Sequence, residues 1–306
     1  MHRQDDGWSE YWQQDSADGE VFVNAKGDAH PALATFWARA FAAGAPGARV
    51  LDIASGAGSI YAHLPADHGF ELHAADIAPE ALATLSRRIA GVTTTVASAA
   101  EMPFDDRSFD LVLSQFGVEY AGVEAFAEAA RVVASEGRLV MLAHIEDGYI
   151  DSNNKAQLNE AHVVRTTKFI EQAKVLTGTA FKKGGKALLK REKAFVPAIQ
   201  ELVAAQRRCG QGVHAHLLAG FKQLYENRRQ YDLADITGWL DGMQGELDKT
   251  VDRLSRMRAA ALSGSDAEDI RSMLEASGFA EISIEAFSTP GNKLPVAWEL
   301  VAKRAK

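Results

Sequence analysis

The chain has 306 residues, of which 47% are hydrophobic and 24% charged, a composition typical of a folded globular protein. Its formal net charge of -8 disfavours a nucleic-acid partner, because binding to phosphates usually needs a basic face. The one cysteine, Cys209, excludes an internal disulfide and a cysteine-based zinc cluster, which fits a reducing cytoplasm. Residues 1–20 hold no apolar signal-peptide run, and no uncharged apolar stretch reaches about 18 residues. We therefore expect a cytoplasmic protein with no membrane partner.

The N-terminal segment is rich in aromatic side chains. The spacing of Trp8, Tyr11 and Trp12 puts three rings on one helical face. A helix is predicted over 31–43, because proline is favoured in the first turn. The three rings and Phe22 either form an aromatic cover over a ligand site or dock the N-terminal helix on the core.

Short apolar runs then alternate with helical patterns. Strands are predicted over 49–54, 70–75, 92–96, 109–114 and 137–145. Helices are predicted between them, over 59–64, 79–90 and 122–133. This alternation predicts an α/β fold with a doubly wound, mostly parallel sheet and helices on both faces.

The C-terminal part resumes this pattern after a long helical stretch. Ser265 or Asp266 is expected to cap a helix that runs to Ala276 and is closed by Gly278. Strands over 281–287 and 296–301 are predicted to form an antiparallel hairpin at the sheet edge, which completes seven strands.

The predicted elements divide the chain into three regions. Residues 1–44 form an N-terminal helical cap, and residues 45–150 with 264–306 form the α/β domain. Residues 151–263 contain no convincing strand and are predicted to be a large helical insertion, which would serve as a lid, a substrate element or a dimerisation element.

A glycine-rich turn follows the first strand. Gly56 and Gly58 let the backbone approach a ligand, and Asp76 ends the next strand, where a carboxylate can accept hydrogen bonds from ribose hydroxyls. Dinucleotide binding fits poorly, because a third glycine near Tyr61 is missing. Asp52 would also repel a pyrophosphate, whereas it would attract an amino group.

Two segments carry a family resemblance. Val50-Leu-Asp-Ile-Ala-Ser-Gly-Ala-Gly58 resembles the first motif of class I S-adenosylmethionine-dependent methyltransferases. The stretch from Ser98 to Phe116 resembles the adenine-side loop and fourth strand of the same family. The resemblance covers about residues 48–144 well and 267–303 more loosely, and it does not reach the helical insertion.

The resemblance implies a complete set of S-adenosylmethionine contacts. Asp52 would hold the methionine ammonium group and Asp76 the ribose hydroxyls. The turn under the methionine and ribose would consist of Ala54, Ser55, Gly56 and Gly58. The adenine would meet Ile77, Ser98 and Ala99. The strand-end residues near the methyl group would be Ser114 and Gln115.

Two positions depart from the family pattern. Ala54 stands where the family has the first of three alternating glycines, and its methyl group is tolerable if the backbone stays in a β conformation. Ser98 stands where relatives often carry Asp, and a hydroxyl accepts a hydrogen bond from the adenine amino group more weakly than a carboxylate does.

Candidate catalytic residues follow the strands that face the cofactor. His144 is a candidate base at the end of the fifth strand, as are Glu119 and Tyr120 after the fourth. Glu146 and the N-terminal His30 are further candidates. His144 could equally be a hydrogen-bonded structural histidine.

The first half of the insertion is basic. Between Arg165 and Lys193 only Glu171 and Glu192 oppose the positive charges. This run would bind an anionic acceptor or RNA, or it is simply a solvated helix face. His214 and His216 alternate and so point to different sides of a helix, and we expect no metal site.

The leading functional hypothesis is a small-molecule O- or N-methyltransferase that uses S-adenosylmethionine. The acceptor pocket would be formed partly by the insertion, whose basic run would suit an anionic acceptor. A homodimer is compatible with a long helical arm. The alternatives are a non-catalytic S-adenosylmethionine-binding assembly protein, an RNA methyltransferase that uses the basic insertion and, more distantly, a nicotinamide-dependent dehydrogenase.

Overall fold

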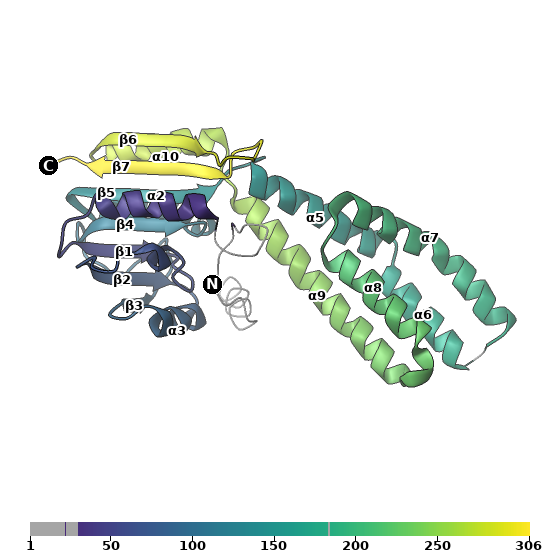
Figure 1. Ribbon diagram of the computed structural model, residues 1–306. Helices are drawn as coiled ribbons and strands as arrows, with labels where there is room; N and C mark the ends of the chain where they lie inside the picture. The colour runs from purple at the N-terminus through teal and green to yellow at the C-terminus, as the bar shows by residue number, and fades with distance from the viewer. Residues whose placement is uncertain (1–21, 23–29, 183) are drawn as a thin grey trace. The chain divides into compact units, whose positions relative to one another are not determined.

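The computed structural model describes residues 22, 30–182 and 184–306 (Figure 1). The chain divides into two compact units. One consists of Met1–Asp151 and Ala260–Lys306, and we call it the α/β unit. The other, Ser152–Ala259, is called the helical unit. No helix in the described part of the chain is long and apolar enough to span a membrane.

The described residues of the α/β unit form a seven-stranded sheet with the order β3-β2-β1-β4-β5-β7-β6. The strands are β1 (Arg49–Ile53), β2 (Glu71–Asp76), β3 (Thr93–Val96), β4 (Phe109–Gln115), β5 (Val133–His144), β6 (Phe279–Phe287) and β7 (Ala297–Arg304). β1 to β5 pair in parallel, and β7 runs antiparallel to both β5 and β6. The predicted fold class, a mostly parallel sheet with an antiparallel C-terminal hairpin, is confirmed.

Helices pack on the sheet. α4 (Glu124–Val132) and α10 (Gly264–Ala276) contact one another and share a core with the strands, in which Phe126, Leu139 and Leu300 are buried. α2 (Pro31–Ala42) crosses in front of the sheet in Figure 1. α3 (Pro79–Arg88) contacts β2 and β3. Each of these helices has an apolar stripe along one side, and it packs on the sheet because this removes the stripe from water.

Two helix predictions need correction. The segment predicted as a helix over 59–64 forms only a short 3-10 turn, η1 (Ile60–His63). The cap of α10 is Ser263, and not Ser265 or Asp266. Ser263 Oγ accepts from Asp266 N at 3.2 Å, and the Asp266 carboxylate accepts from Ser263 N at 2.8 Å, so this reciprocal pair satisfies two free amide donors. Gly278 closes the helix with a φ of +86°, as predicted.

The helical unit has a hydrophobic core of its own. Its elements are α5 (Tyr149–Thr166), which starts in the α/β unit, α6 (Phe169–Lys182), α7 (Lys186–Cys209), α8 (Val213–Glu226), η3 (Arg228–Gln230) and α9 (Leu233–Ala260). Phe169, Phe195 and Phe221 pack ring against ring, with centroids 4.7 to 5.9 Å apart. The prediction of packed helices without strands holds for the described residues of this unit.

Candidate cofactor and methyl-transfer site

The residues predicted to bind the cofactor lie at one edge of the sheet. β1, β2 and β4 run in parallel, with Asp52 opposite both Ala74 and Leu113. β5 runs parallel to β4, and Gln115 pairs with Leu142 near the end of both strands. The carboxyl ends of all four strands therefore share an edge, which is where open α/β sheets bind their ligands.

The turn after β1 is left-handed at several positions. Ala54 and Gly56 have φ of +52°, and Gly58 has +82°. The condition that Ala54 stays in a β conformation is therefore not met, because its φ lies in the left-handed region. A left-handed conformation brings the Cβ of an L-residue close to the following carbonyl, which glycine avoids. The Ala54 methyl group lies against Gly117, where an added Cβ would come within 2.6 Å of it.

Asp52 is a buried carboxylate without a hydrogen-bond donor. Its side chain is fully buried, and neither Oδ1 nor Oδ2 has a partner among the described residues. Burial raises the pKa of Asp52 well above its usual value, and the nearby Asp76 carboxylate raises it further. Ser55 Oγ is also buried and has no partner in the described part. An ammonium group would supply the missing donors, so these residues fit the methionine end of S-adenosylmethionine.

Asp76 connects two turns. Its Oδ2 accepts a hydrogen bond from Gly56 N at 2.8 Å, and its Oδ1 accepts one from Ala78 N at 2.8 Å. Burial raises the pKa of Asp76, while these backbone donors act in the opposite direction. Each oxygen retains capacity for a second hydrogen bond. The carboxylate thus holds the glycine turn in place and can still accept from ribose hydroxyls.

The predicted adenine-side residues lie next to Asp76. Ala97 N donates to the Asp76 carbonyl at 3.0 Å, which places the start of the loop beside the end of β2. Ser98 Oγ accepts from Ala100 N at 3.3 Å and so shapes the loop locally. Ile77 is half-buried, and Ala99 packs against the core. The structure therefore brings the predicted adenine residues together around one strand end.

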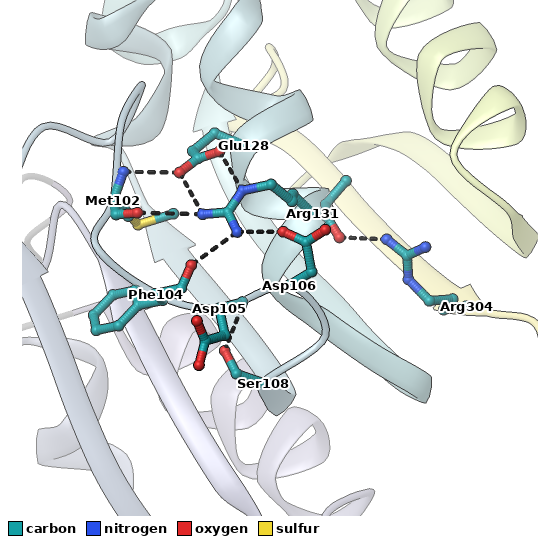
Figure 2. Close-up of polar contacts among 9 residues, drawn as sticks. Met102, Phe104, Asp105, Asp106, Ser108, Glu128, Arg131 and Arg304 are labelled. Atoms are coloured by element: carbon teal, nitrogen blue, oxygen red, sulfur yellow. Dashed lines mark hydrogen bonds and ion pairs between the residues drawn. The ribbon is translucent and has the colours of Figure 1, made fainter.

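Arg131 anchors the rest of this loop, and sequence reasoning missed it. Figure 2 shows its guanidinium on α4 between Glu128, the Asp106 carboxylate and two loop carbonyls. It donates to Glu128 at 2.7 and 2.8 Å and to Asp106 at 2.6 Å. It also donates to the carbonyls of Phe104 at 2.8 Å and Met102 at 3.2 Å. A signal was present, because Glu128 and Arg131 have the i,i+3 spacing of a helical ion pair.

The two strand-end residues predicted near the methyl group have partners within the fold. Ser114 Oγ is buried, donates to the Ile53 carbonyl at 2.8 Å and accepts from Val118 N at 3.3 Å. Gln115 Oε1 accepts from Trp37 Nε1 of α2 at 2.5 Å. Both side chains therefore hold neighbouring segments at this edge, and Trp37 is a residue of the site that the sequence did not single out.

His144 and Glu119 form a buried pair at the end of β5. Glu119 lies in η2 (Val118–Ala121), and its Oε1 contacts His144 Nδ1 at 2.6 Å and accepts from His144 N at 2.9 Å. The side chains are 2% and 0% exposed. His144 Nε2 and Glu119 Oε2 have no partner among the described residues. With Nδ1 carrying the proton for Glu119, Nε2 keeps a free lone pair, as a general base requires.

The other candidate bases have different positions. The ring of Tyr120 lies edge-on to that of His144, with centroids 5.8 Å apart. His30 caps α2, because its Nδ1 accepts from Ala32 N at 3.2 Å, and its ring stacks on Phe22. Glu146 is exposed. The predicted aromatic cover of Trp8, Tyr11 and Trp12 lies outside the described residues.

Comparison with known proteins agrees with this geometry. Residues 51–141 match a family model described as a methyltransferase domain. The chain is 38% identical over 98 residues to a demethylmenaquinone methyltransferase of Beutenbergia cavernae, and the aligned segment covers 31% of this chain and 40% of that protein. A demethylmenaquinone methyltransferase of Clavibacter sepedonicus is 40% identical over 101 residues, covering 31% and 40%. The ubiquinone/menaquinone biosynthesis C-methyltransferase of Citrifermentans bemidjiense is 31% identical over 104 residues, covering 31% and 44%.

Residues 51–141 of the α/β unit match a methyltransferase domain, and the mostly parallel seven-stranded sheet is the fold predicted from the resemblance to class I S-adenosylmethionine-dependent methyltransferases. The matched family and the unpartnered Asp52 beside the left-handed turn indicate the same cofactor, S-adenosylmethionine. The chain spans about two fifths of the length of the curated relatives named above.

Proposed function

We propose that this protein transfers the methyl group of S-adenosylmethionine to a small-molecule acceptor. The observation that carries the proposal is the buried, unpartnered carboxylate of Asp52 at a turn held by Asp76. In this proposal Asp52 binds the ammonium group and Asp76 the ribose hydroxyls. Ile77, Ser98 and Ala99 enclose the adenine.

Calorimetry with S-adenosylhomocysteine tests the cofactor part. The unmodified protein should bind it, and Asp52→Asn should weaken the binding by at least about tenfold, because a charge-assisted hydrogen bond is lost without a change in shape. Asp67→Asn is the matched control, since Asp67 is exposed and lies away from the glycine turn in the sequence. A protein that binds neither the cofactor nor its demethylated product would refute the proposal.

The bound cofactor would supply an electrophilic methyl group on a sulfonium. We assign His144 as the general base that removes the acceptor's proton, and Glu119 as the residue that positions it. Glu119 Oε1 fixes the imidazole through Nδ1, which leaves Nε2 free to take a proton. Kinetic measurements distinguish this catalytic role of the pair from a purely structural one.

Substitution of His144 separates catalysis from structure. General base catalysis contributes about 100- to 10,000-fold, so His144→Gln should lower kcat by that factor while leaving S-adenosylhomocysteine affinity unchanged. Glu119→Gln should lower kcat less, and it should shift the pH profile of kcat/KM, which a purely structural residue would not do. His216→Gln, on the exposed side of α8, is the control. An unchanged kcat in His144→Gln would remove the base assignment.

The proposal extends to the atom of the acceptor that is methylated. The residue set suits an oxygen or nitrogen nucleophile that loses a proton as it is methylated. The second candidate is a quinone-type carbon acceptor, which the similarity to demethylmenaquinone methyltransferases and to a ubiquinone/menaquinone biosynthesis C-methyltransferase favours. Incubation with isotope-labelled S-adenosylmethionine and panels of phenols, amines and demethylated quinones, followed by mass spectrometry, distinguishes them. The helical unit lies beyond the matched residues 51–141, and we propose that it contributes to acceptor choice.

A further inference from the structure

We propose that the hairpin of α6 and α7 binds the surface of a bilayer that contains anionic lipids. The proposal concerns a surface of the helical unit and does not depend on methyl transfer. Its centre is a stripe on α7 that consists of Lys186, Leu189, Lys193 and Val196, which we call the outer face of α7.

The four residues lie on one side of the helix. They are spaced by three, four and three positions, which places them one above the other on an α-helix. All four are exposed, and the two apolar side chains are 59% (Leu189) and 43% (Val196) accessible. The opposite side of α7 is buried in the core of the helical unit through Phe195, Ala198 and Leu202. The packing of the unit therefore does not use the outer face.

Exposed apolar side chains concentrate on this hairpin. Among the described residues, four of the six large apolar side chains that are exposed belong to α6 and α7. They are Leu189 and Val196 on α7, and Val175 and Phe181 on α6, at 48% and 39% exposure. α6 and α7 contact one another along the hairpin. Isolated exposed side chains are ordinary, but a cluster of them is typical of an interaction surface.

The same hairpin carries cations without acidic partners. No ion pair in the described part of the chain involves any of a set of five, namely Lys182, Lys186, Lys190, Arg191 and Lys193. Two other cations of the helical unit, Arg165 on α5 and Lys174 on α6, are neutralised by Asp248 and Asp241. Glu192 is the one acid in the sequence between Lys182 and Lys193, and its carboxylate accepts a hydrogen bond from Tyr225. This local excess of positive charge stands out in a chain whose net charge is -8.

Lysines that alternate with apolar side chains match a lipid surface better than RNA or a small anion. Phosphates alone would attract Lys186 and Lys193 but would leave Leu189 and Val196 in water. A bilayer satisfies both, because the headgroups take the ammonium groups while Leu189 and Val196 enter the boundary with the acyl chains. The contact is peripheral, so it needs no membrane-spanning helix. The proposal differs in this from the sequence-based expectation of no membrane partner.

Vesicle flotation tests the proposal. The full-length protein should float with vesicles of phosphatidylcholine and phosphatidylglycerol in equal parts, and it should not float with phosphatidylcholine alone. A basic residue near an anionic surface contributes about a factor of five in partitioning, so Lys186→Gln, Lys190→Gln and Lys193→Gln together should lower the partition coefficient by about a hundredfold. Leu189→Ser with Val196→Ser should lower it by about tenfold or more. Binding should also weaken with added salt.

The matched control removes three exposed cations elsewhere. Lys222→Gln, Arg229→Gln and Lys293→Gln give the same net charge as the triple lysine variant, and they should leave flotation unchanged. Equal losses in the control and in the α7 variant would overturn the proposal, because net charge would then explain the binding. So would an absence of flotation, or retention of an RNA oligonucleotide that needs the lysines but not Leu189 and Val196. All variants change exposed side chains, and circular dichroism confirms their folding.

Discussion

Ala54 offers a sharp test of the turn geometry. It adopts a φ of +52° where glycine would be unstrained. Ala54→Gly should therefore stabilise the α/β unit, although the change from alanine to glycine normally destabilises a protein. The expected sign is opposite to the usual one, which makes the measurement decisive.

The magnitude follows from three contributions. A left-handed alanine costs about 1.5 kcal/mol, which the substitution relieves. The added freedom of glycine in the unfolded chain costs about 0.7 kcal/mol. The methyl group is half-buried against Gly117, and its loss costs about 0.4 kcal/mol, roughly half of a fully buried CH2. The net stabilisation is about 0.4 kcal/mol.

Urea unfolding, followed by circular dichroism, measures this difference. Ala66→Gly is the control, because Ala66 is exposed in a turn and has no left-handed backbone, so it should lose about 0.5 kcal/mol. Gly117→Ala adds a second test. Its new Cβ would lie 2.6 Å from the Ala54 Cβ and 2.9 Å from the Ala54 oxygen, so its cost should fall by about 1 kcal/mol or more when residue 54 is glycine. A destabilising Ala54→Gly and additive double substitutions would refute the argument.

Three further predictions follow. Burial raises the pKa of Asp52, so its contribution to stability is full below the unfolded pKa and is lost as pH rises toward the folded pKa. Asp52→Asn should thus stabilise the cofactor-free protein at neutral pH, and binding of S-adenosylhomocysteine to the unmodified protein should release protons, measured by calorimetry in buffers of different ionisation enthalpy. Arg131→Ala should cost about 3 kcal/mol of unfolding free energy and weaken cofactor binding, because the loop loses its anchors; an unaffected affinity would contradict this. Ser263→Ala should cost about 1 kcal/mol in thermal unfolding, whereas Ser265→Ala should cost less than half of that.

Much of the fold was predictable because local patterns agree with the tertiary structure. Every predicted strand of the parallel sheet exists, and no strand end shifts by more than four residues. β5 shows the largest shift: it begins at Val133, where the prediction continued the preceding helix. The apolar pattern could not reveal this, because Ser135 and Glu136 interrupt the run.

The sequence singled out the residues of the proposed cofactor site, but it did not indicate the contacts that these residues make with one another. Asp52, Gly56, Gly58 and Asp76 were found from their positions at strand ends. Their hydrogen bonds were not, because the donor that Asp76 binds at Gly56 lies 20 residues away in the chain. Ser114 was predicted to lie near the methyl group, but its hydroxyl is hydrogen-bonded to the backbone of Ile53 and Val118, which the sequence could not indicate.

The sequence by itself determined the class of the domain, since apolar runs, glycines and acids at strand ends are local properties. Only the tertiary structure decided three matters. Within the described residues, it left the Asp52 carboxylate without a hydrogen-bond donor, it placed Glu119 on His144, and it exposed Leu189 and Val196 beside lysines that form no ion pair there. The burial of Asp52, the pairing of Glu119 with His144 and the exposure of Leu189 and Val196 all depend on contacts between residues that are distant in the chain. In the glycine-rich turn, the sequence motif predicted the ligand, whereas the fold determined the left-handed strain at Ala54.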